Sequence, residues 1–390
     1  MKLQFVYVTH NLTRNPLRTL LTCAAVALPI TIFVLTSGVI DGIERFLDNS
    51  GRQLRLAVTQ KTSIINPLPA GHRAKIESLD PTHTRIVAVC GMRWLGGKIE
   101  NDPRPLSTVA ADPDTFPATY PEYLHDPNEL AAWQRDRQAI VVGRGTANQF
   151  HWKTGDRITI RASVPPYSAM QFHVVSISAD ADDPITNFCR RDYVEEEIKR
   201  AGWLEGLLSF IFVKCASKAD LEHYRGEIDN LFARSTDETL TQDEKTFMNQ
   251  FITQQFNLPR NLRILAAITI LVAILAAANT MSMNFRDRRD EFAALRAIGF
   301  GTLLIRALIQ SESLLICVLG GLFGALGPFI AFTYTPLRNY TVPLIQQLDI
   351  RPLVCLQAIG IAAVIGVLAA AWPSWLAVRL KVVDAFRALE

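Results

Sequence analysis

Residues 264–285, with the sequence ILAAITILVAILAAANTMSMNF, contain no charged side chain. An α-helix needs about 20 apolar residues to cross a hydrocarbon core that is about 30 Å thick. Three further runs of at least this length also lack charge, at residues 20–40, 313–337 and 352–378. Helices buried in soluble domains rarely stay apolar for so long, so the sequence predicts four transmembrane helices.

The composition of the whole chain indicates that only part of it lies in lipid. Of 390 residues, 49% are hydrophobic and 20% are charged, and the net charge is +3. This balance excludes a disordered chain and gives no reason to expect a nucleic-acid-binding surface. Six cysteines in a chain of this length are too few for a disulfide scaffold.

The first apolar run could instead belong to a signal peptide, because Lys2, Arg14 and Arg18 precede it. However, the run is longer than the apolar core of about 7–15 residues that signal peptides carry. The residues TSGV at 36–39 also lack an Ala-x-Ala cleavage pattern. We therefore predict an uncleaved first span.

The distribution of Lys and Arg predicts the orientation of the spans, since cytoplasmic flanks are enriched in these residues. The loop between the third and fourth runs contains only Arg338 and Arg351. Both chain ends and the loop between the second and third runs are richer, with Lys2, Arg14, Arg18, Arg286, Arg288, Arg289, Arg296, Arg306, Arg379, Lys381 and Arg387. The pattern places those three segments in the cytoplasm and residues 41–263 outside.

Residues 41–263 alternate strand-like runs with turns and a few helical stretches, which is typical of an α+β domain, here expected to have two lobes. Strands are predicted at residues 85–90, 157–161, 172–177 and 210–213, and a helix at 218–234 with Leu221, Tyr224, Ile228, Leu231 and Phe232 on one face.

Residues 41–56 and 243–260 read as helical extensions of spans one and two. They would form a stalk side by side, or else two independent surface helices. The predicted fold class is therefore an α-helical membrane protein with four transmembrane helices and a large α+β extracytoplasmic domain between helices one and two.

The chain shows no catalytic or cofactor signature. It lacks a P-loop, a G-x-S-x-G elbow, an H-E-x-x-H helix and a C-x-x-C pair, and no two histidines have the spacing of a helix-borne metal pair. The acidic residues 180–184 read as a solvated turn. Cys90, Cys189 and Cys215 lie in the predicted outer domain and could form at most one disulfide, which the sequence leaves open. We predict no enzyme activity, no metal and no cofactor in this chain.

Several polar and small residues occur within the apolar runs. Glu312 lies close to Arg306, which favours hydration or pairing at the interface over a proton relay. Asn279 is expected to donate a hydrogen bond to another helix. A face of small residues for helix packing is predicted at Gly320, Gly321, Gly324 and Gly327. Packing within one subunit and dimerisation explain this face equally well.

Motifs along nearly the whole chain resemble those of FtsX-like permeases. The segment RDEFAALRAIG at residues 289–299 is similar to the family signature R-x-E-x-x-x-L-R-A-I-G. The start NLTRNPLRTLL at 11–21 resembles the family's N-terminal elbow, and PSWLAVR at 373–379 with VDAFR at 383–387 resembles its closing motif, with valine where a proline is common. Within the outer domain, QAIVVG at 138–143, TGDRI at 154–158 and FHVVSI at 172–177 follow the pattern of the MacB-like periplasmic core domain, with Ser176 replacing a glycine.

The resemblance implies a membrane subunit of a MacB- or LolC/LolE-type ABC transporter with three parts. Residues 1–40 would form the elbow and first helix, 41–263 the MacB-like periplasmic core with stalk helices, and 264–390 the FtsX-like permease domain. ATP would be bound and hydrolysed by a separate ATPase, coupled to the outer domain by mechanotransmission. The ATPase would contact the cytoplasmic segment 286–306, through Arg289, Glu291, Leu295, Arg296 and Gly299.

The implied partners are the ABC ATPase, a second permease subunit in a homodimer or related heterodimer, membrane lipid and, for efflux, a periplasmic adaptor protein. The implied location is a bacterial cytoplasmic (inner) membrane. Lipids, lipoproteins, peptides and drug-like molecules all stay open as substrates for export or extraction. The alternative is an FtsX-like regulator of cell-envelope enzymes that transports nothing, although FtsX carries a much smaller outer domain. A membrane-anchored enzyme is disfavoured because no catalytic constellation exists.

Overall fold

The computed structural model describes residues 16–99, 102, 104–124, 126–178, 186–256, 258–335, 348 and 350–378. The chain divides into two compact units, which are described separately. The helical unit comprises Met1–Gly42, Leu258–Leu337 and Leu348–Glu390, and the other unit comprises Ile43–Asn257 and Arg338–Gln347. The predicted turn at 180–184 and the motif residues 11–15 and 379–387 lie outside the described residues.

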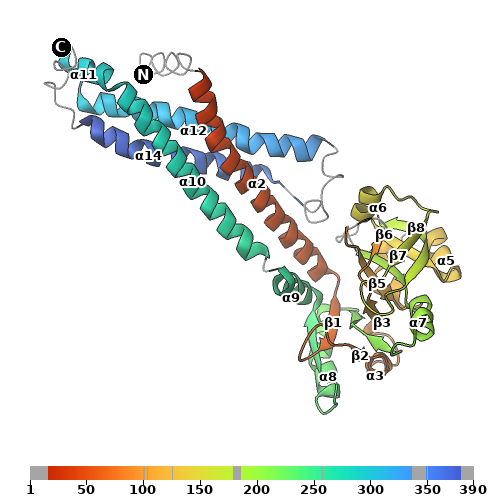
Figure 1. The fold of residues 1–390 in the computed structure, drawn as a ribbon. Coiled ribbons are helices and arrows are strands. Elements are labelled where there is room, and N and C mark those ends of the chain that lie inside the picture. Colours follow the sequence, from red (N-terminus) through yellow and green to blue (C-terminus); the bar gives the residue numbers. More distant parts are fainter. Residues whose placement is uncertain are drawn as a thin grey trace. The chain divides into compact units, whose positions relative to one another are not determined.

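Four long helices are apolar enough to cross a membrane, which confirms the predicted number of spans. They are α2 (Pro16–Arg52), α10 (Leu258–Asp287), α12 (Thr302–Tyr334) and α14 (Pro352–Val378) (Figure 1). Three of them, α2, α10 and α12, are longer than their charge-free runs. Helix α2 continues to Arg52, as the stalk prediction required, and α12 begins before Arg306 and Glu312, which a charge-free window cannot include.

The spans within the helical unit are not equally buried. Helix α12 packs closely on α14, and α10 packs mainly on α14 rather than on α12. Only 17% of the most apolar window of α10 is buried inside the structure, against 39% for α2 and α12 and 44% for α14. Helix α10 is therefore the peripheral helix among the four.

The inserted domain (Ile43–Asn257) is an α+β domain built on one ten-stranded sheet, where two lobes were expected. All neighbouring strands are antiparallel except the parallel pairs β5–β9 and β6–β8. The strand order is β12 (Thr239–Asp243), β1 (Arg55–Gln60), β11 (Phe210–Cys215), β3 (Ile86–Trp94), β5 (Ser107–Ala111), β9 (Thr186–Arg190), β6 (Ala139–Gly143), β8 (Ala169–Ser178), β7 (Arg157–Arg161) and β4 (Lys98–Ile99). A separate two-stranded sheet pairs β2 (Leu68–Pro69) with β10 (Leu207–Leu208).

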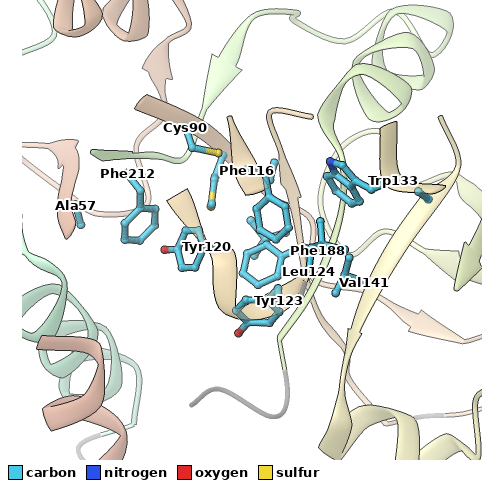
Figure 2. Packing of buried hydrophobic residues seen from close by; sticks show 14 of the residues in the cluster. Ala57, Cys90, Phe116, Tyr120, Tyr123, Leu124, Trp133, Val141, Phe188 and Phe212 are labelled. Atoms are coloured by element: carbon cyan, nitrogen blue, oxygen red, sulfur yellow. The ribbon is translucent and has the colours of Figure 1, made fainter. Parts of the chain in front are cut away.

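Successive side chains along each strand point to opposite faces of the sheet. The buried apolar residues described for this domain form three clusters on these two faces. On one face, α3 (Gly71–Glu77) and α8 (Lys218–Phe232) contribute to one cluster and α6 (Arg144–Phe150) and α7 (Arg191–Arg200) to another. The opposite face carries one aromatic cluster from α4 (Phe116–Thr119), η1 (Pro121–Tyr123), α5 (Pro127–Arg135) and α9 (Glu244–Phe256) (Figure 2). Because this cluster contains residues of both β1 and β6, it joins the two halves of the sheet. The predicted helix at 218–234 is confirmed as α8, but Leu231 is 43% exposed, so its assignment to the buried face was wrong.

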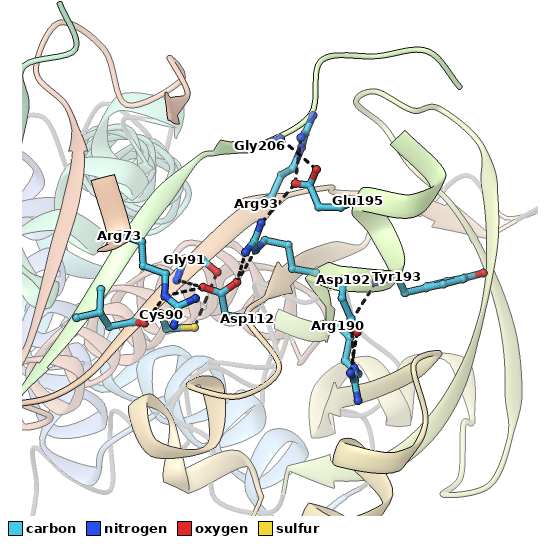
Figure 3. A network of polar contacts seen from close by, with 12 residues as sticks. Arg73, Cys90, Gly91, Arg93, Asp112, Arg190, Asp192, Tyr193, Glu195 and Gly206 are labelled. Atoms are coloured by element: carbon cyan, nitrogen blue, oxygen red, sulfur yellow. Dashed lines mark hydrogen bonds and ion pairs between the residues drawn. The ribbon is translucent and has the colours of Figure 1, made fainter. Parts of the chain in front are cut away.

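The buried carboxylate of Asp112 connects two helices of the inserted domain to two strands of its sheet. Asp112 follows β5 and accepts a hydrogen bond from the amide of Gly91 at 2.8 Å. Its second oxygen accepts from Arg191 at 2.5 Å, and Arg73 lies 3.4 Å away (Figure 3). The carboxylate therefore ties α3 and α7 to strands β3 and β5.

A second buried network lies where the chain enters and leaves the inserted domain, and we call it the neck network. Arg55 begins β1, three residues after α2 ends, and donates to Glu244, the first residue of α9, at 2.6 Å. It also donates to Glu122 at 2.6 Å and lies 3.9 Å from the centre of the Tyr120 ring. Arg55 and Glu244 are 4% and 3% exposed. Burial alone would lower the pKa of Arg55, but the two carboxylates outweigh burial and raise it above its ordinary value.

The ends of α2 and α9 also meet at the surface of the domain. Asp48 accepts from Lys245 at 2.6 Å, and both side chains are at least half exposed. A Cβ added at Gly51 would lie 3.3 Å from the Lys245 side chain. The two predicted extensions are therefore in contact where α2 ends and α9 begins.

Cys90, Cys189 and Cys215 in the inserted domain are free and buried. Burial raises the pKa of the Cys90 and Cys215 thiols to about 12 and that of Cys189 further. No disulfide joins these three cysteines in the structure.

Candidate functional site

The signature-like segment 289–299 folds as a short helix between two spans. Helix α11 (Arg289–Ala297) is separated from α10 by Arg288. It ends in a Schellman motif, in which Gly299 donates to the carbonyl of Arg296 at 3.1 Å and Phe300 donates to that of Leu295 at 3.0 Å. Gly299 has φ +101°, a conformation that favours glycine. The chain can thereby reverse at once into α12, whose N-cap is Gly301.

One face of α11 is anchored in the helical unit by apolar contacts. Phe292 is 2% exposed, and its ring stacks on that of Phe285 in α10 with centroids 5.9 Å apart. Phe292 also belongs to a buried cluster with Ile305 and Ile309 of α12 and Ala370 of α14. Helix α11 is therefore packed against three of the four spans.

A buried polar network, here called the α11 network, fixes the start of the same helix. Arg288 donates to Glu312 of α12 at 2.9 Å and to Glu291 of α11 at 2.9 Å. Asn284 of α10 donates to the other oxygen of Glu312 at 2.8 Å. The Arg288 and Glu312 side chains are 11% and 10% exposed and line a small hollow with Phe285. Glu312 is therefore paired, but with Arg288 and not with Arg306, which is exposed.

The five residues predicted to contact an ATPase do not all point outward. Glu291 and Arg296 are half-buried, and each has polar partners within the chain. Leu295 is half-buried and packs against the cluster around Phe292, so it is less available to a partner than the sequence suggested. Arg289 and Gly299 are exposed.

The apolar surface beside α11 comes instead from the turn that follows it. Ile298 is 76% exposed and Leu303, in the first turn of α12, is 80% exposed. Phe300 between them is 36% exposed. Large apolar side chains flanked by Arg289 and Arg306 give a surface of the kind that a protein partner can bury. The sequence predicted a contact role for Leu295, whereas in the structure the nearby Ile298 is the more exposed apolar side chain.

The four predicted packing glycines occupy different surroundings. A Cβ at Gly320 would lie 2.7 Å from the carbonyl oxygen of Cys23 in α2, and one at Gly324 would collide with the carbonyl of Ala27. One at Gly321 would collide with Ala362 of α14. These three positions therefore let α12 approach two neighbouring helices of the same chain. A Cβ at Gly327 meets no heavy atom within 4 Å, so a packing role there stays a prediction.

Sequence reasoning missed Arg288 and Asn284 as partners of Glu312. Both side chains lie in the polar stretch where α10 ends, and nothing in their spacing from Glu312 marks them. Among the described residues, no group of three or more His, Cys, Asp or Glu side chains could hold a metal ion.

The helices and the inserted domain define a multi-pass membrane protein with a large α+β domain between its first two spans. Residues 263–382 match the model of the FtsX-like permease C-terminal family. This segment, which contains α11 and three spans, is therefore similar to FtsX-like permeases, in agreement with the motif at residues 289–299.

Individual relatives are similar to this chain over only part of its length. An ABC transporter permease of Methanocaldococcus jannaschii is 26% identical over 59% of this chain and 58% of its own length. The macrolide export ATP-binding/permease protein MacB of Syntrophobacter fumaroxidans is 31% identical over 31% of this chain and 16% of its own length. The chain thus spans less than two thirds of the curated relatives it matches. The periplasmic region of MacB from Actinobacillus actinomycetemcomitans aligns with 51% of this chain and 92% of its own, at 10% identity and a TM-score of 0.33.

Proposed function

We propose that this chain is the permease subunit of an ABC transporter in a bacterial cytoplasmic membrane. A separate ATPase binds and hydrolyses ATP, docks on α11 and the turn at Ile298, and drives the inserted domain outside the membrane by mechanotransmission. The family of residues 263–382 and the names of the relatives support this proposal. The transported molecule is a lipid, lipoprotein, peptide or drug-like compound handled on the outer side.

The observation that carries the proposal is that α11 is both exposed and firmly held. Phe292 and the Arg288–Glu312 pair connect it to α10, α12 and α14, while Ile298 and Leu303 face outward. A push on the exposed turn would therefore move the spans rather than merely bend a loop. Helix α2 is one continuous helix from Pro16 to Arg52, so the first span and the segment that leads to β1 belong to the same helix.

The proposed complex contains a second permease subunit, and an adaptor protein joins it where substrate must cross an outer membrane. An FtsX-like regulator would use the same ATPase contact without moving a substrate. The inserted domain, with its ten-stranded sheet, favours the transporter. A regulator that only transmits a signal needs no outer domain of this size, whereas a transporter can use it to bind substrate. Nucleotide-dependent transfer of a substrate would separate the two functions.

The docking contact can be tested by co-purification of this permease with its ABC ATPase partner. Replacing Ile298 with Asp would bury a charge in the contact, and Glu291→Lys would reverse a charge next to it. We expect at least about a tenfold loss of bound ATPase for Ile298→Asp, as for a central interface anchor. The control is Leu204→Asp, because Leu204 is 70% exposed but lies in the inserted domain.

The control variant should retain the ATPase at the level of the unaltered protein. If Ile298→Asp and Glu291→Lys retain it equally well, α11 and its turn are an ordinary loop and the proposed coupling is refuted.

A further inference from the structure

Two tryptophans lie together on the exposed side of α14. Trp372 and Trp375 are 60% and 42% exposed, and their rings stack with centroids 5.2 Å apart. They continue a stripe of half-exposed apolar side chains, formed by Val364, Val367 and Leu368, with the three- and four-residue spacing of a helix face. One face of α14 is therefore aliphatic along the span and aromatic near its end.

The length of α14 places the tryptophan pair at a membrane surface. Trp372 lies 20 residues after Pro352, where the helix begins, and this corresponds to about 30 Å. A hydrocarbon core has about the same thickness. Because the charged Arg351 directly precedes the helix, the pair reaches the headgroup layer at the other surface, on the side of α11, which the sequence predicts to be cytoplasmic. Indole rings favour this layer, since they combine an apolar body with a polar N–H group.

Helix α12 holds the turn of α14 that carries the tryptophans. The Gln310 side chain donates to the carbonyl of Val367 at 2.9 Å and accepts from the Ser374 hydroxyl at 3.4 Å. Both contacts lie within one or two turns of the tryptophans. The aromatic pair is therefore presented by a helix segment that its neighbour keeps in place.

The same edge of α12 supplies a positive charge. Arg306 precedes Gln310 by one helical turn and lies on the same face. The two helices run antiparallel, because Ser313 bonds to Gly366 and Cys355 to Ala325, and they lie side by side (Figure 1). Arg306 is therefore close to the level of the tryptophan pair. It is exposed and forms no ion pair with the residues that the structure describes.

We propose that Arg306 and the tryptophan pair bind an anionic phospholipid from the leaflet on the side of α11. The guanidinium donates to the phosphate, the indoles lie at the level of the glycerol, and an acyl chain lies along the aliphatic stripe of α14. An unpaired cation beside an apolar stripe complements a molecule with a negative head and an apolar tail. A free phosphate ion would engage Arg306 alone and leave the stripe without a partner. Binding of a lipid requires no ATPase, so this inference does not depend on the proposed function.

The test uses the full chain in vesicles of equal parts phosphatidylcholine and phosphatidylglycerol, with bromine on the acyl chains of one of the two lipids. Brominated chains quench the fluorescence of tryptophans that they contact. Of the six tryptophans, the other four belong to the inserted domain, so quenching reports on Trp372 and Trp375. We expect brominated phosphatidylglycerol to quench more strongly, corresponding to about a fivefold preference for the anionic lipid.

Variants of single arginines assign the preference to its source. Arg306→Gln should abolish the preference, and Arg306→Lys, which keeps the charge, should retain most of it. The matched control is Arg263→Gln, because Arg263 is also exposed but lies at the opposite end of the spans, and it should leave the preference unchanged.

Four results would overturn the inference. Equal quenching by the two brominated lipids would show that the site does not select an anionic lipid, and an unchanged preference in Arg306→Gln would show that this arginine does not bind it. Weak quenching by both lipids would mean that a protein, such as a second copy of the chain, covers the tryptophans. Loss of the preference on addition of inorganic phosphate would identify a site for a free anion.

Discussion

The neck network and the α11 network are both built on an arginine paired with a carboxylate, but they hold different kinds of structure. Arg55 donates to two carboxylates and to the carbonyl of Thr119, all within the inserted domain. Arg288 holds a short helix against the spans through Glu312, with Glu291 and Asn284 beside it.

The difference lies in what surrounds each arginine. Arg55 begins a strand that is paired on both sides, by β11 and β12, and it is covered by an aromatic ring. Arg288 occupies the break between two helices and borders a small hollow. Removing one partner from a pair that is enclosed by a sheet costs more than removing one from a pair that borders a hollow, because the remaining charge is cut off from water. We infer that both networks hold their elements in place and that the neck network contributes more to stability than the α11 network does.

The largest effect is expected when Arg55 is replaced with Met. The variant leaves Glu244 buried without its cation, which typically costs about 3–5 kcal/mol. The free energy of unfolding of the inserted domain should fall by this amount, measured by denaturant titration with hydrogen exchange in its strands. The control Lys245→Met removes an exposed pair and should cost about 1 kcal/mol or less. Equal losses for the two variants would mean that the neck network does not stabilise the inserted domain more than an exposed ion pair does.

A smaller and more local effect is expected for Glu312→Gln. The amide can still accept from Arg288 or Asn284, but the charge is lost, so a cost of about 1–3 kcal/mol is expected. Hydrogen exchange should accelerate in α11 and less ATPase should co-purify, while exchange in the inserted domain stays unchanged. Faster exchange in the inserted domain but not in α11 would contradict the assignment of this pair to α11.

Sequence reasoning predicted the parts of this protein that depend on local patterns. The four spans follow from the thickness of a membrane, and the strands at 157–161 and 172–177 and helix α8 follow from periodicity. The strand order of the sheet depends on pairings such as β1 with β12, which are remote in the chain and leave no local signal. For this reason one continuous sheet appeared as two lobes.

The candidate site was predictable as a segment but not as a surface. The motif identified residues 289–299, yet the side of α11 that is buried is decided by Phe285 and by α12 and α14. Leu295 and Ile298 are equally apolar, so only their surroundings distinguish an anchored side chain from an exposed one. The partner of Glu312 was missed for the same reason, because Arg288 reaches it only in the folded helical unit, from the break between α10 and α11.

The smallest expected effect separates the turn after α11 from both networks. Gly299 has φ +101°, whereas Gly301 has φ −63°, and a Cβ added at either meets no heavy atom within 4 Å. Gly299→Ala should therefore strain the backbone by about 1 kcal/mol without a steric clash, and Gly301→Ala should not. The measurement is hydrogen exchange of the amides of Gly299 and Phe300, which close the Schellman motif. We expect about fivefold faster exchange in Gly299→Ala alone, with both networks unaffected. If Gly301→Ala accelerates exchange equally, the motif is not what ends α11, and the turn that presents Ile298 is held by its apolar contacts instead.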